Sequence, residues 1–212
     1  MLFIFDWDGT LSDSTAKITG AMQSAMDDLG HPVLATEQVK SIIGLGLPEA
    51  VRTLIPGIDE PGIQAMRSRY VYHFEEVDPT PPPLYPTALE TLEGLLNRGH
   101  QIAIATGKSR RGLNKVLAEL ELTDLFHASR CADETASKPH PRMLQELLQE
   151  FQVPAADAVM IGDTAFDLEM AQNAAMRSVA VDYGAHPLDR LMPYKPIMCI
   201  SKMRELLDFP CS

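Results

Sequence analysis

The chain has 212 residues, of which 45% are hydrophobic and 22% charged, a composition typical of globular proteins and unlike that of disordered or fibrous chains. The 29 Asp and Glu residues outnumber the 18 Lys and Arg residues, which gives a formal net charge of -11. A field of this sign repels nucleic-acid phosphates and anionic lipid headgroups, so we expect no nucleic-acid partner and no membrane binding. An anionic substrate would need its charge offset locally, by a cation or by backbone N–H groups.

The cysteines and the first residues indicate a reducing compartment. Cys131, Cys199 and Cys211 are odd in number and form no Cys-x-x-Cys pair, so we expect neither a disulfide framework nor a zinc site. The apolar run Met1–Phe5 has no basic segment before it and leads directly into Asp6. We therefore interpret it as a buried strand and expect a cytoplasmic protein without a removable targeting peptide.

Short apolar runs alternate with helical periodicity along most of the chain. The runs have the composition of buried parallel strands and are Leu2–Phe5, Gln101–Ala105, Leu125–Ser129, Ala158–Ile161 and Ser178–Val181, with Pro196–Ile200 as a candidate sixth. Between them, apolar residues recur at spacings of three and four, as in Leu113, Val116, Leu117 and Leu120. This alternation predicts an α/β fold with a doubly wound, Rossmann-like parallel sheet.

The interval between the first two runs is too long for a single crossover, since about 90 residues lie where one or two dozen would suffice. Within it, Ile18, Met22, Ala25 and Leu29 mark an amphipathic helix, and similar patterns follow it. We predict a helical cap domain over residues 15–80, inserted into an α/β core made of residues 1–14 and 81–212. The proline-rich segment Asp78–Pro86 is predicted to be a semi-rigid linker at the exit of the cap.

Four aspartates follow two of the predicted strands. Asp6 and Asp8 come directly after the first strand, and Asp163 and Asp167 come directly after the fourth. Because ligands of open α/β sheets bind at the carboxyl ends of the strands, we expect these carboxylates to converge. Converging acids repel one another unless a hard cation lies between them. Mg²⁺ is the favoured ion, because it prefers oxygen ligands and accepts substrate phosphate in its coordination sphere.

Groups suited to a phosphoryl oxygen lie elsewhere in the chain. Thr106 and Gly107 end the strand that begins at Gln101, where they offer a hydroxyl and backbone N–H groups. Lys138 precedes Pro139 in a polar loop and offers a positive charge. Taken singly, each of these segments is also compatible with a solvated turn or a surface lysine.

Taken together, these segments resemble the haloacid dehalogenase superfamily of phosphohydrolases over nearly the whole chain. The family's first motif, Asp-x-Asp-Gly-Thr, matches Asp6–Thr10, and its second, an apolar strand ending in Thr or Ser, matches Thr106. Its third motif, a lysine, matches Lys138, and its fourth matches Gly162–Asp167. The order and spacing of the motifs agree as well as their content. Within the superfamily, the continuation after the first motif resembles the phosphoglycolate phosphatase branch.

The resemblance implies roles for the first two aspartates. Asp6 is expected to be the nucleophile that attacks phosphorus and forms an aspartyl-phosphate. Asp8 is expected to protonate the leaving alcohol and later to deprotonate the attacking water. An acid at the second position distinguishes phosphate-ester chemistry from dehalogenation, because a departing halide needs no proton.

The resemblance also implies how the site is assembled. The Mg²⁺ ligands would be the Asp6 carboxylate, the backbone carbonyl of Asp8 and Asp163, with Asp167 as a ligand or its neighbour. The phosphoryl oxygens would be bound by three residues, namely Thr106, Gly107 and Lys138.

We therefore expect a magnesium-dependent phosphatase acting on a small phosphorylated metabolite such as phosphoglycolate. Three alternatives stay open: a sugar-phosphate mutase of the β-phosphoglucomutase kind, an inorganic pyrophosphatase, and a non-catalytic partner-binding domain. A phosphonate-cleaving relative would need a cap lysine, for which Lys17 and Lys40 are the candidates, although both fit a solvated helix face. The chain is expected to be a monomer or a homodimer.

The residues that would select the leaving group are harder to assign. The cap loop Ser41–Pro48 resembles the substrate-facing loop of the family, but a helix end followed by a new helix start explains it equally well. Arg52 is either a substrate-binding residue or an exposed helix residue. One of Lys108, Arg110 and Arg111 is a candidate for the edge of the phosphate pocket, and helix N-terminal surface is the alternative. The six histidines, including His186, show no paired metal spacing and are expected on the surface or in loops.

Overall fold

The sheet that the apolar runs predict is present in the computed structural model, which describes residues 1–210; Cys211 lies outside them. All pairings are parallel, and the strand order is β3-β2-β1-β4-β5-β6. The strands are β1 Leu2–Phe5, β2 Gln101–Thr106, β3 Ala128–Cys131, β4 Ala158–Gly162, β5 Arg177–Val181 and β6 Met198–Ile200. Because the order reverses between β1 and β4, the carboxyl ends of these two strands form the switch point where open α/β sheets bind ligands.

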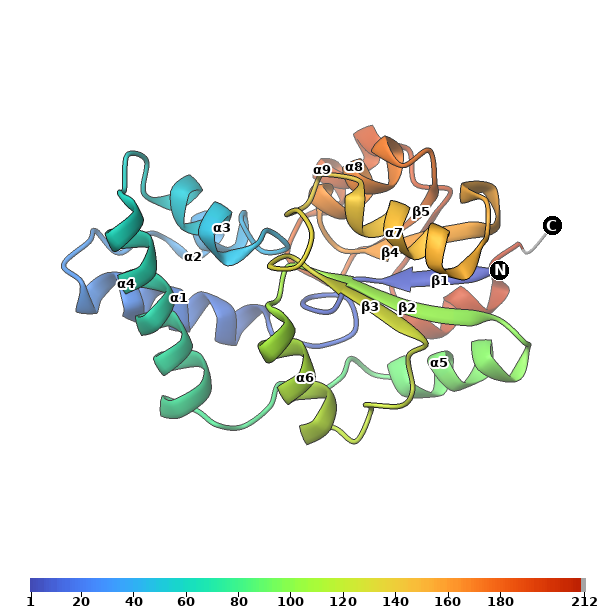
Figure 1. The fold of residues 1–212 in the computed structure, drawn as a ribbon, viewed down its shortest axis with the longest axis horizontal. Helices are drawn as coiled ribbons and strands as arrows, with labels where there is room; N and C mark the ends of the chain where they lie inside the picture. The colour runs from blue at the N-terminus through green and yellow to red at the C-terminus, as the bar shows by residue number, and fades with distance from the viewer. Residues whose placement is uncertain (211–212) are drawn as a thin grey trace.

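Helices cover both faces of the sheet, as Figure 1 shows. On one face, Phe3 and Phe5 pack with the helices α5 (Ala88–Asn97) and α6 (Arg110–Glu119). On the other face, Leu2 and Ile4 pack with α7 (Arg142–Phe151) and α8 (Ala165–Asn173). A strand with apolar side chains on both sides needs this double cover, which is why β1 is a continuous apolar run. The predicted doubly wound α/β fold is confirmed.

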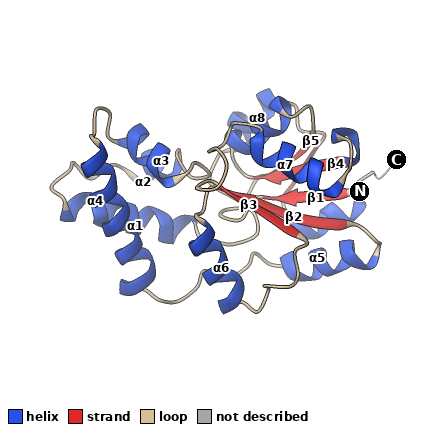
Figure 2. Cartoon of the chain, viewed as in Figure 1, coloured by secondary structure: helices blue, strands red, loops and turns tan. Residues whose placement is uncertain are grey.

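The segment between β1 and α5 is helical, and Figure 2 shows it beside the carboxyl ends of the strands. Its helices are α1 Thr15–Asp28, α2 Thr36–Lys40, α3 Leu47–Leu54, α4 Glu60–Val71 and a π-helix, Tyr72–Val77. They enclose an apolar cluster of their own, which is separate from the two clusters of the sheet and includes Met22, Met26, Val39, Val51, Ile63 and Met66. The amphipathic stripe beginning at Ile18 therefore packs mainly against other helices of this segment.

The two connections of the helical segment to the sheet lie side by side. The backbone N–H of Asp13 donates to the carbonyl of Pro83, and that of Tyr85 donates to the carbonyl of Leu11, each at 2.9 Å. The proline-rich exit contains neither helix nor strand from residue 78 to 83, in line with the predicted linker.

One predicted strand is displaced in the structure. The run Leu125–Ser129 was expected to form the third strand, but β3 begins at Ala128, opposite Ala103 of β2. Leu125 and Phe126 instead precede the strand and pack their side chains against the core of the sheet. Leu125 and Phe126 are partly buried, as is Ala128 at the start of the strand, so apolar composition alone could not place that start. The remaining short elements are α9 Leu188–Leu191 and the 3₁₀ turns Ala155–Asp157, Met192–Tyr194 and Met203–Asp208.

Candidate active site

Three carboxylates meet at the switch point of the sheet. Asp6 follows the last residue of β1, and Asp163 follows the last residue of the neighbouring strand β4. Asp167 lies in the first turn of α8. One oxygen from each of the three lies within 4.8 Å of the others, and all three side chains are buried. The convergence expected from the sequence is therefore present for these three aspartates.

The first motif fixes the position of Asp163 across the sheet. The hydroxyl of Thr10 donates to Asp163 Oδ1 at 2.7 Å, and the backbone N–H of Ala185 donates to Oδ2 at 2.7 Å. Gly9 has a φ of +85°, and a Cβ at this position would lie 2.2 Å from Asp163 Oδ2. Glycine is thus required both by the turn and by the close approach of the carboxylate.

Asp167 is held by the start of its own helix. Thr164 is the N-cap of α8, and its hydroxyl and backbone N–H donate to Asp167 Oδ2 at 2.7 and 3.1 Å. The other oxygen, Oδ1, accepts from Lys138 Nζ at 2.6 Å. A helix N-terminus favours negative charge, so this position stabilises a carboxylate.

Lys138 joins the acidic cluster to the first motif. Its Nζ lies 2.7 Å from Asp6 Oδ1 and 2.6 Å from Asp167 Oδ1, and the residue is 2% exposed. Burial alone would lower the pKa of Lys138, but the carboxylates of Asp167 and Asp6 outweigh it and raise the pKa above its ordinary value. The ammonium group is therefore a permanent positive charge beside Asp6.

The carboxylates of this cluster meet the requirements of a divalent cation. Asp6 Oδ2 is buried and has no hydrogen-bond partner among the described residues, while Oδ1 accepts from the backbone N–H of Trp7 at 2.7 Å. Burial and the neighbouring carboxylates raise the pKa of Asp6 well above its usual value, and burial and Asp167 raise the pKa of Asp163 to about 7. A hard cation among these oxygens would satisfy the free oxygen and offset the repulsion that raises both pKa values.

Asp8 lies next to the triad but makes different contacts. Its Oδ1 accepts from the hydroxyl of Ser14 at 2.7 Å, and both of its oxygens accept from Lys108 Nζ at 2.9 Å. The role of Lys108 was left open by the sequence, whereas Arg110 pairs with Glu134 away from this point. Lys108 precedes α6 in the turn that leaves β2, and this placement directs it toward Asp8.

The turn after β2 also receives the loop of the helical segment. Thr106 is buried, and its hydroxyl accepts from the backbone N–H of Lys108 at 3.2 Å. A Cβ added to Gly107 would lie 2.6 Å from the carbonyl oxygen of Leu45 and 2.7 Å from that of Gly44. Only a residue without a side chain allows the loop to lie this close to the core.

Two basic residues of the helical segment stay outside the site. Arg52 pairs with Glu60 at 3.1 Å and its side chain is half exposed, and Lys40 pairs with Glu37 at 3.7 Å. Lys17 was expected on a solvated helix face, but its ammonium group is held by backbone carbonyls. Its Nζ donates to the backbone carbonyls of Asp78 and Thr80 at 2.6 Å, because the proline-rich linker passes over the start of α1.

His186 lies in the loop after β5, in line with the expectation of a surface or loop position, but it is buried. This residue is 2% exposed, and its Nδ1 accepts from the backbone N–H of Ala165 at 3.0 Å. Its Nε2 lies 3.1 Å from the carbonyl of Ser41 in the helical segment. Burial and the nearby Arg190 lower the pKa of His186 to about 4, so the imidazole is neutral and Nε2 carries the proton that it donates. Sequence spacing gives no signal for such a bridge.

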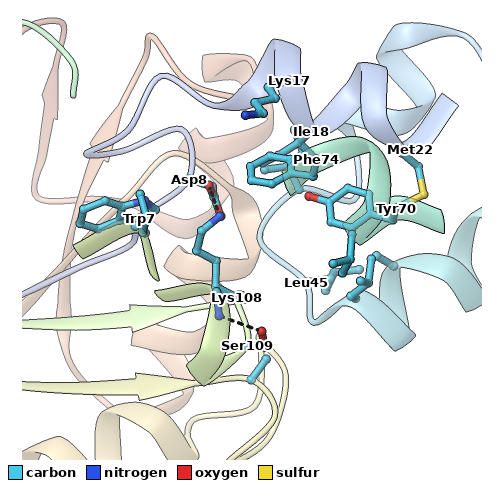
Figure 3. Close-up of a pocket in the computed structure, with 18 of the residues that line it drawn as sticks. Trp7, Asp8, Lys17, Ile18, Met22, Leu45, Tyr70, Phe74, Lys108 and Ser109 are labelled. Atoms are coloured by element: carbon cyan, nitrogen blue, oxygen red, sulfur yellow. Dashed lines mark hydrogen bonds and ion pairs between the residues drawn. The ribbon is translucent and has the colours of Figure 1, made fainter. Parts of the chain in front are cut away.

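A cavity of about 300 Å³ lies between the sheet and the helical segment. Asp6, Asp8 and Lys108 line it from the sheet side, and residues of α1, α4 and the loop before α3 line it from the opposite side. Figure 3 shows the Asp8–Lys108 pair facing Tyr70 and Phe74. This volume is at the lower end of the range for small-molecule sites.

Residues 3–181 match the family model described as haloacid dehalogenase-like hydrolase, and the chain belongs to this family of hydrolases. It is 33% identical over 210 residues to a protein of Dickeya dadantii named "Probable phosphatase IndB", which covers 97% of this chain and 91% of that protein. It is 30% identical over 214 residues to a phosphoglycolate phosphatase of Aliivibrio fischeri, with 97% and 94% covered. The resemblance stated from the motifs is thereby confirmed.

Solved structures show the same fold. A hydrolase from Pseudomonas syringae superposes with a TM-score of 0.89 at 23% identity, covering 98% of this chain and 96% of that one. A haloacid dehalogenase-like family protein from Streptococcus pneumoniae gives a TM-score of 0.84 at 24% identity, with 98% and 97% covered. Among the described residues, no helix is both long enough and apolar enough to cross a membrane.

Proposed function

We propose that this chain is a magnesium-dependent phosphatase that hydrolyses a small phosphomonoester through an aspartyl-phosphate on Asp6. The observation that carries the proposal is the asymmetry of the Asp6 carboxylate. Its Oδ1 lies 2.7 Å from the ammonium group of Lys138, and its buried Oδ2 has no partner among the described residues. A carboxylate held at one oxygen and free at the other is arranged for nucleophilic attack or metal binding.

The residues of the triad fit the metal site that the motifs predict. Asp6, Asp163 and Asp167 would hold Mg²⁺ together with the backbone carbonyl of Asp8, and the bound ion would neutralise charge on the phosphoryl group. Thr106, with the backbone N–H groups around Gly107, would donate to phosphoryl oxygens, and Lys138 would offset the negative charge at Asp6.

The first displacement forms the bond between an Asp6 oxygen and phosphorus and breaks the bond between phosphorus and the ester oxygen. The departing oxygen takes the proton of the Asp8 carboxylic acid, so a neutral alcohol leaves. In the second displacement, water attacks phosphorus and gives its proton to the Asp8 carboxylate. The bond between phosphorus and the Asp6 oxygen breaks, and phosphate leaves with the original carboxylate restored.

We propose further that residues 15–80 act as a cap over a core made of residues 1–14 and 81–212. The separate apolar cluster of the helical segment supports this division. Two hydrogen bonds join the cap to the core: Gly46 N–H donates to Ser137 Oγ at 2.8 Å, and His186 Nε2 donates to the carbonyl of Ser41 at 3.1 Å. A closed cap excludes water other than the one that reacts and thereby strengthens the electrostatic interactions of the site.

The substrate is proposed to be a small phosphorylated metabolite, and the names of the relatives make phosphoglycolate the first compound to test. We also propose that the protein is cytoplasmic. We propose that it is a monomer or a homodimer, since one copy of the site suffices for this chemistry. The decisive assay measures phosphate release from phosphoglycolate, sugar phosphates, nucleotides and pyrophosphate, with and without Mg²⁺.

The Asp6→Asn variant is the control for this assay. Mg²⁺-dependent release that disappears in Asp6→Asn supports the proposal. Transfer of the phosphoryl group to a sugar, with little free phosphate, would instead identify a mutase. No reaction with any of these compounds or with benzyl phosphate, an ester of an apolar alcohol, would contradict the proposed function.

A further inference from the structure

The wall of the cavity opposite Asp8 is apolar. Figure 3 shows Ile18, Met22, Leu45, Tyr70 and Phe74 on this side. The rings of Tyr70 and Phe74 are stacked, with centroids 5.6 Å apart and planes at 22°. They lie four residues apart where α4 passes into the π-helix, a rare geometry that is frequent at functional sites. This wall faces the point where the alcohol part of a phosphomonoester would lie.

The two ammonium groups nearest this wall already have acceptors. Lys108 Nζ donates to both oxygens of Asp8, and Lys17 Nζ donates to two backbone carbonyls of the linker. Both ammonium groups lie over the Phe74 ring, at 5.0 and 4.8 Å from its centroid. A carboxylate bound here would have to share the Lys108 ammonium group with Asp8, the proposed acid and base.

The other two basic residues of the cavity are no better placed. Lys115 pairs with Glu75 at 3.1 Å, and Arg67 donates to the side-chain amide of Gln64 at 3.2 Å. Arg67 precedes Phe74 by seven residues, about 10 Å along a helix. In glycolate, the carboxylate is attached to the carbon that bears the ester oxygen. The carboxylate of bound phosphoglycolate would therefore lie beside Asp8.

The charge of the lining also disfavours a second anionic group. Four basic side chains face six acidic ones, which are Asp6, Asp8, Glu49, Glu75, Glu119 and Asp133. A divalent cation at the triad would offset the negative charge of the phosphoryl group and of the carboxylates that hold the cation. A further anion beside Asp8 would therefore have to share ammonium groups that already have acceptors.

One polar group interrupts the apolar wall. Among the described residues none pairs with the hydroxyl of Tyr70, and Figure 3 shows this hydroxyl directed toward the side of the cavity that holds Asp8. Burial and the charge of Asp8 raise the pKa of Tyr70, so the hydroxyl keeps its proton. It is available to donate to a neutral oxygen or nitrogen of a bound molecule.

We propose that the alcohol released by this enzyme is neutral and largely apolar, and that its body packs on Ile18, Tyr70 and Phe74. A short carboxylate such as glycolate is then a poor leaving group for this cavity. The inference rests on the proposed phosphatase function and specifies its substrate class. Benzyl phosphate and 2-phosphoglycolate test it, since both are phosphate esters of a primary alcohol and differ in whether the body is apolar or anionic.

The first experiment measures binding without turnover. The Asp6→Asn variant, with Mg²⁺ present, is titrated with each ester in a calorimeter. We expect benzyl phosphate to bind at least tenfold more tightly than 2-phosphoglycolate. Equal affinity, tighter binding of 2-phosphoglycolate, or binding of neither ester would overturn the inference, whether or not the intact protein is a phosphatase.

The second experiment compares kcat/KM for variants of the wall. Phe74→Ala is expected to lower kcat/KM for benzyl phosphate at least tenfold and to change that for methyl phosphate less than threefold. Tyr72→Ala, an exposed aromatic outside the cavity, is the matched control and should change neither. Leu45→Lys adds a cation in a loop, where folding is little affected, and should shift the preference toward 2-phosphoglycolate.

The outcomes separate the two proposals. A wild-type preference for 2-phosphoglycolate would overturn the inference and leave the phosphatase function standing. Equal losses of kcat/KM for benzyl phosphate and methyl phosphate in Phe74→Ala would do the same. No phosphate release from any ester, combined with the expected binding preference of Asp6→Asn, would overturn the phosphatase function alone.

Discussion

Replacing Lys138 with Met removes a buried positive charge while keeping a side chain of similar length. The ammonium group lies 2.7 Å from Asp6 and 2.6 Å from Asp167, and none of its side chain is exposed. Removing one partner of a buried ion pair costs about 3–5 kcal/mol, because the other charge is left uncompensated. Domains of this kind have unfolding free energies of about 5–15 kcal/mol, so the variant loses a large part of its stability.

Magnesium should reduce this loss. The carboxylates left by Lys138→Met are more repulsive than in the wild type, so a divalent cation binds them with a larger gain. Urea unfolding, followed with and without Mg²⁺, gives the free energy of unfolding in both states. We expect Mg²⁺ to stabilise Lys138→Met by more kcal/mol than it stabilises the wild type.

Lys115→Met is the matched control for this measurement. Lys115 pairs with Glu75 at 3.1 Å, but its side chain is 37% exposed. An ion pair of this kind is worth about 0–1 kcal/mol, and its loss should be independent of Mg²⁺. A cost for Lys138→Met below about 1 kcal/mol, or an effect of Mg²⁺ equal to that in the control, would refute the electrostatic account of the site.

Three further predictions concern the other parts of the site. In metal-free protein, the raised pKa of Asp163 means that the folded state binds a proton between about pH 4 and 7 that the unfolded state lacks. The free energy of unfolding should therefore rise by up to about 1.4 kcal/mol per pH unit as the pH falls from 7 to 5, and this slope should be smaller in Asp163→Asn. Equal slopes for the two proteins in urea titrations would contradict this prediction. Gly107→Val should push the loop at Leu45 away and lower kcat/KM at least tenfold with little loss of stability, since the clash is between the cap and the core; unchanged kinetics would show that the cap does not close here. Asp8→Asn should lower kcat by about 10²–10⁴-fold but still release one equivalent of nitrophenol from p-nitrophenyl phosphate in a burst, because that leaving group needs no proton; a burst-free reaction would exclude Asp8 as the base of the second step.

The four central strands of the sheet could be predicted closely because they are buried on both faces. Runs such as Leu2–Phe5 are uniformly apolar and end in motif residues, so both their presence and their limits are visible in the sequence. The third strand was misplaced because Leu125 and Phe126 are apolar for packing and not for pairing. A short apolar run has the same composition whether it forms a strand or a packed loop, so composition alone did not place the start of β3.

The triad could be predicted because each member follows a strand at a known edge. The contacts of Lys108, Lys17 and His186 could not, since each joins residues at least 61 positions apart in the sequence. Lys108 lies two residues after the end of β2, and the local sequence does not show whether its side chain faces solvent or Asp8. Contacts between parts that are distant in sequence are fixed by tertiary packing and leave no local periodicity.

The covalent state of Asp6 during turnover tests the central proposal most directly. Protein mixed with substrate and Mg²⁺, quenched in acid and reduced with borohydride, would be digested and analysed by mass spectrometry. The account predicts that the Asp6 carboxyl, and no other, is converted to an alcohol, and that the product is absent in Asp6→Asn. Phosphate release at full rate with an unmodified Asp6 peptide, or modification of another residue, would contradict it.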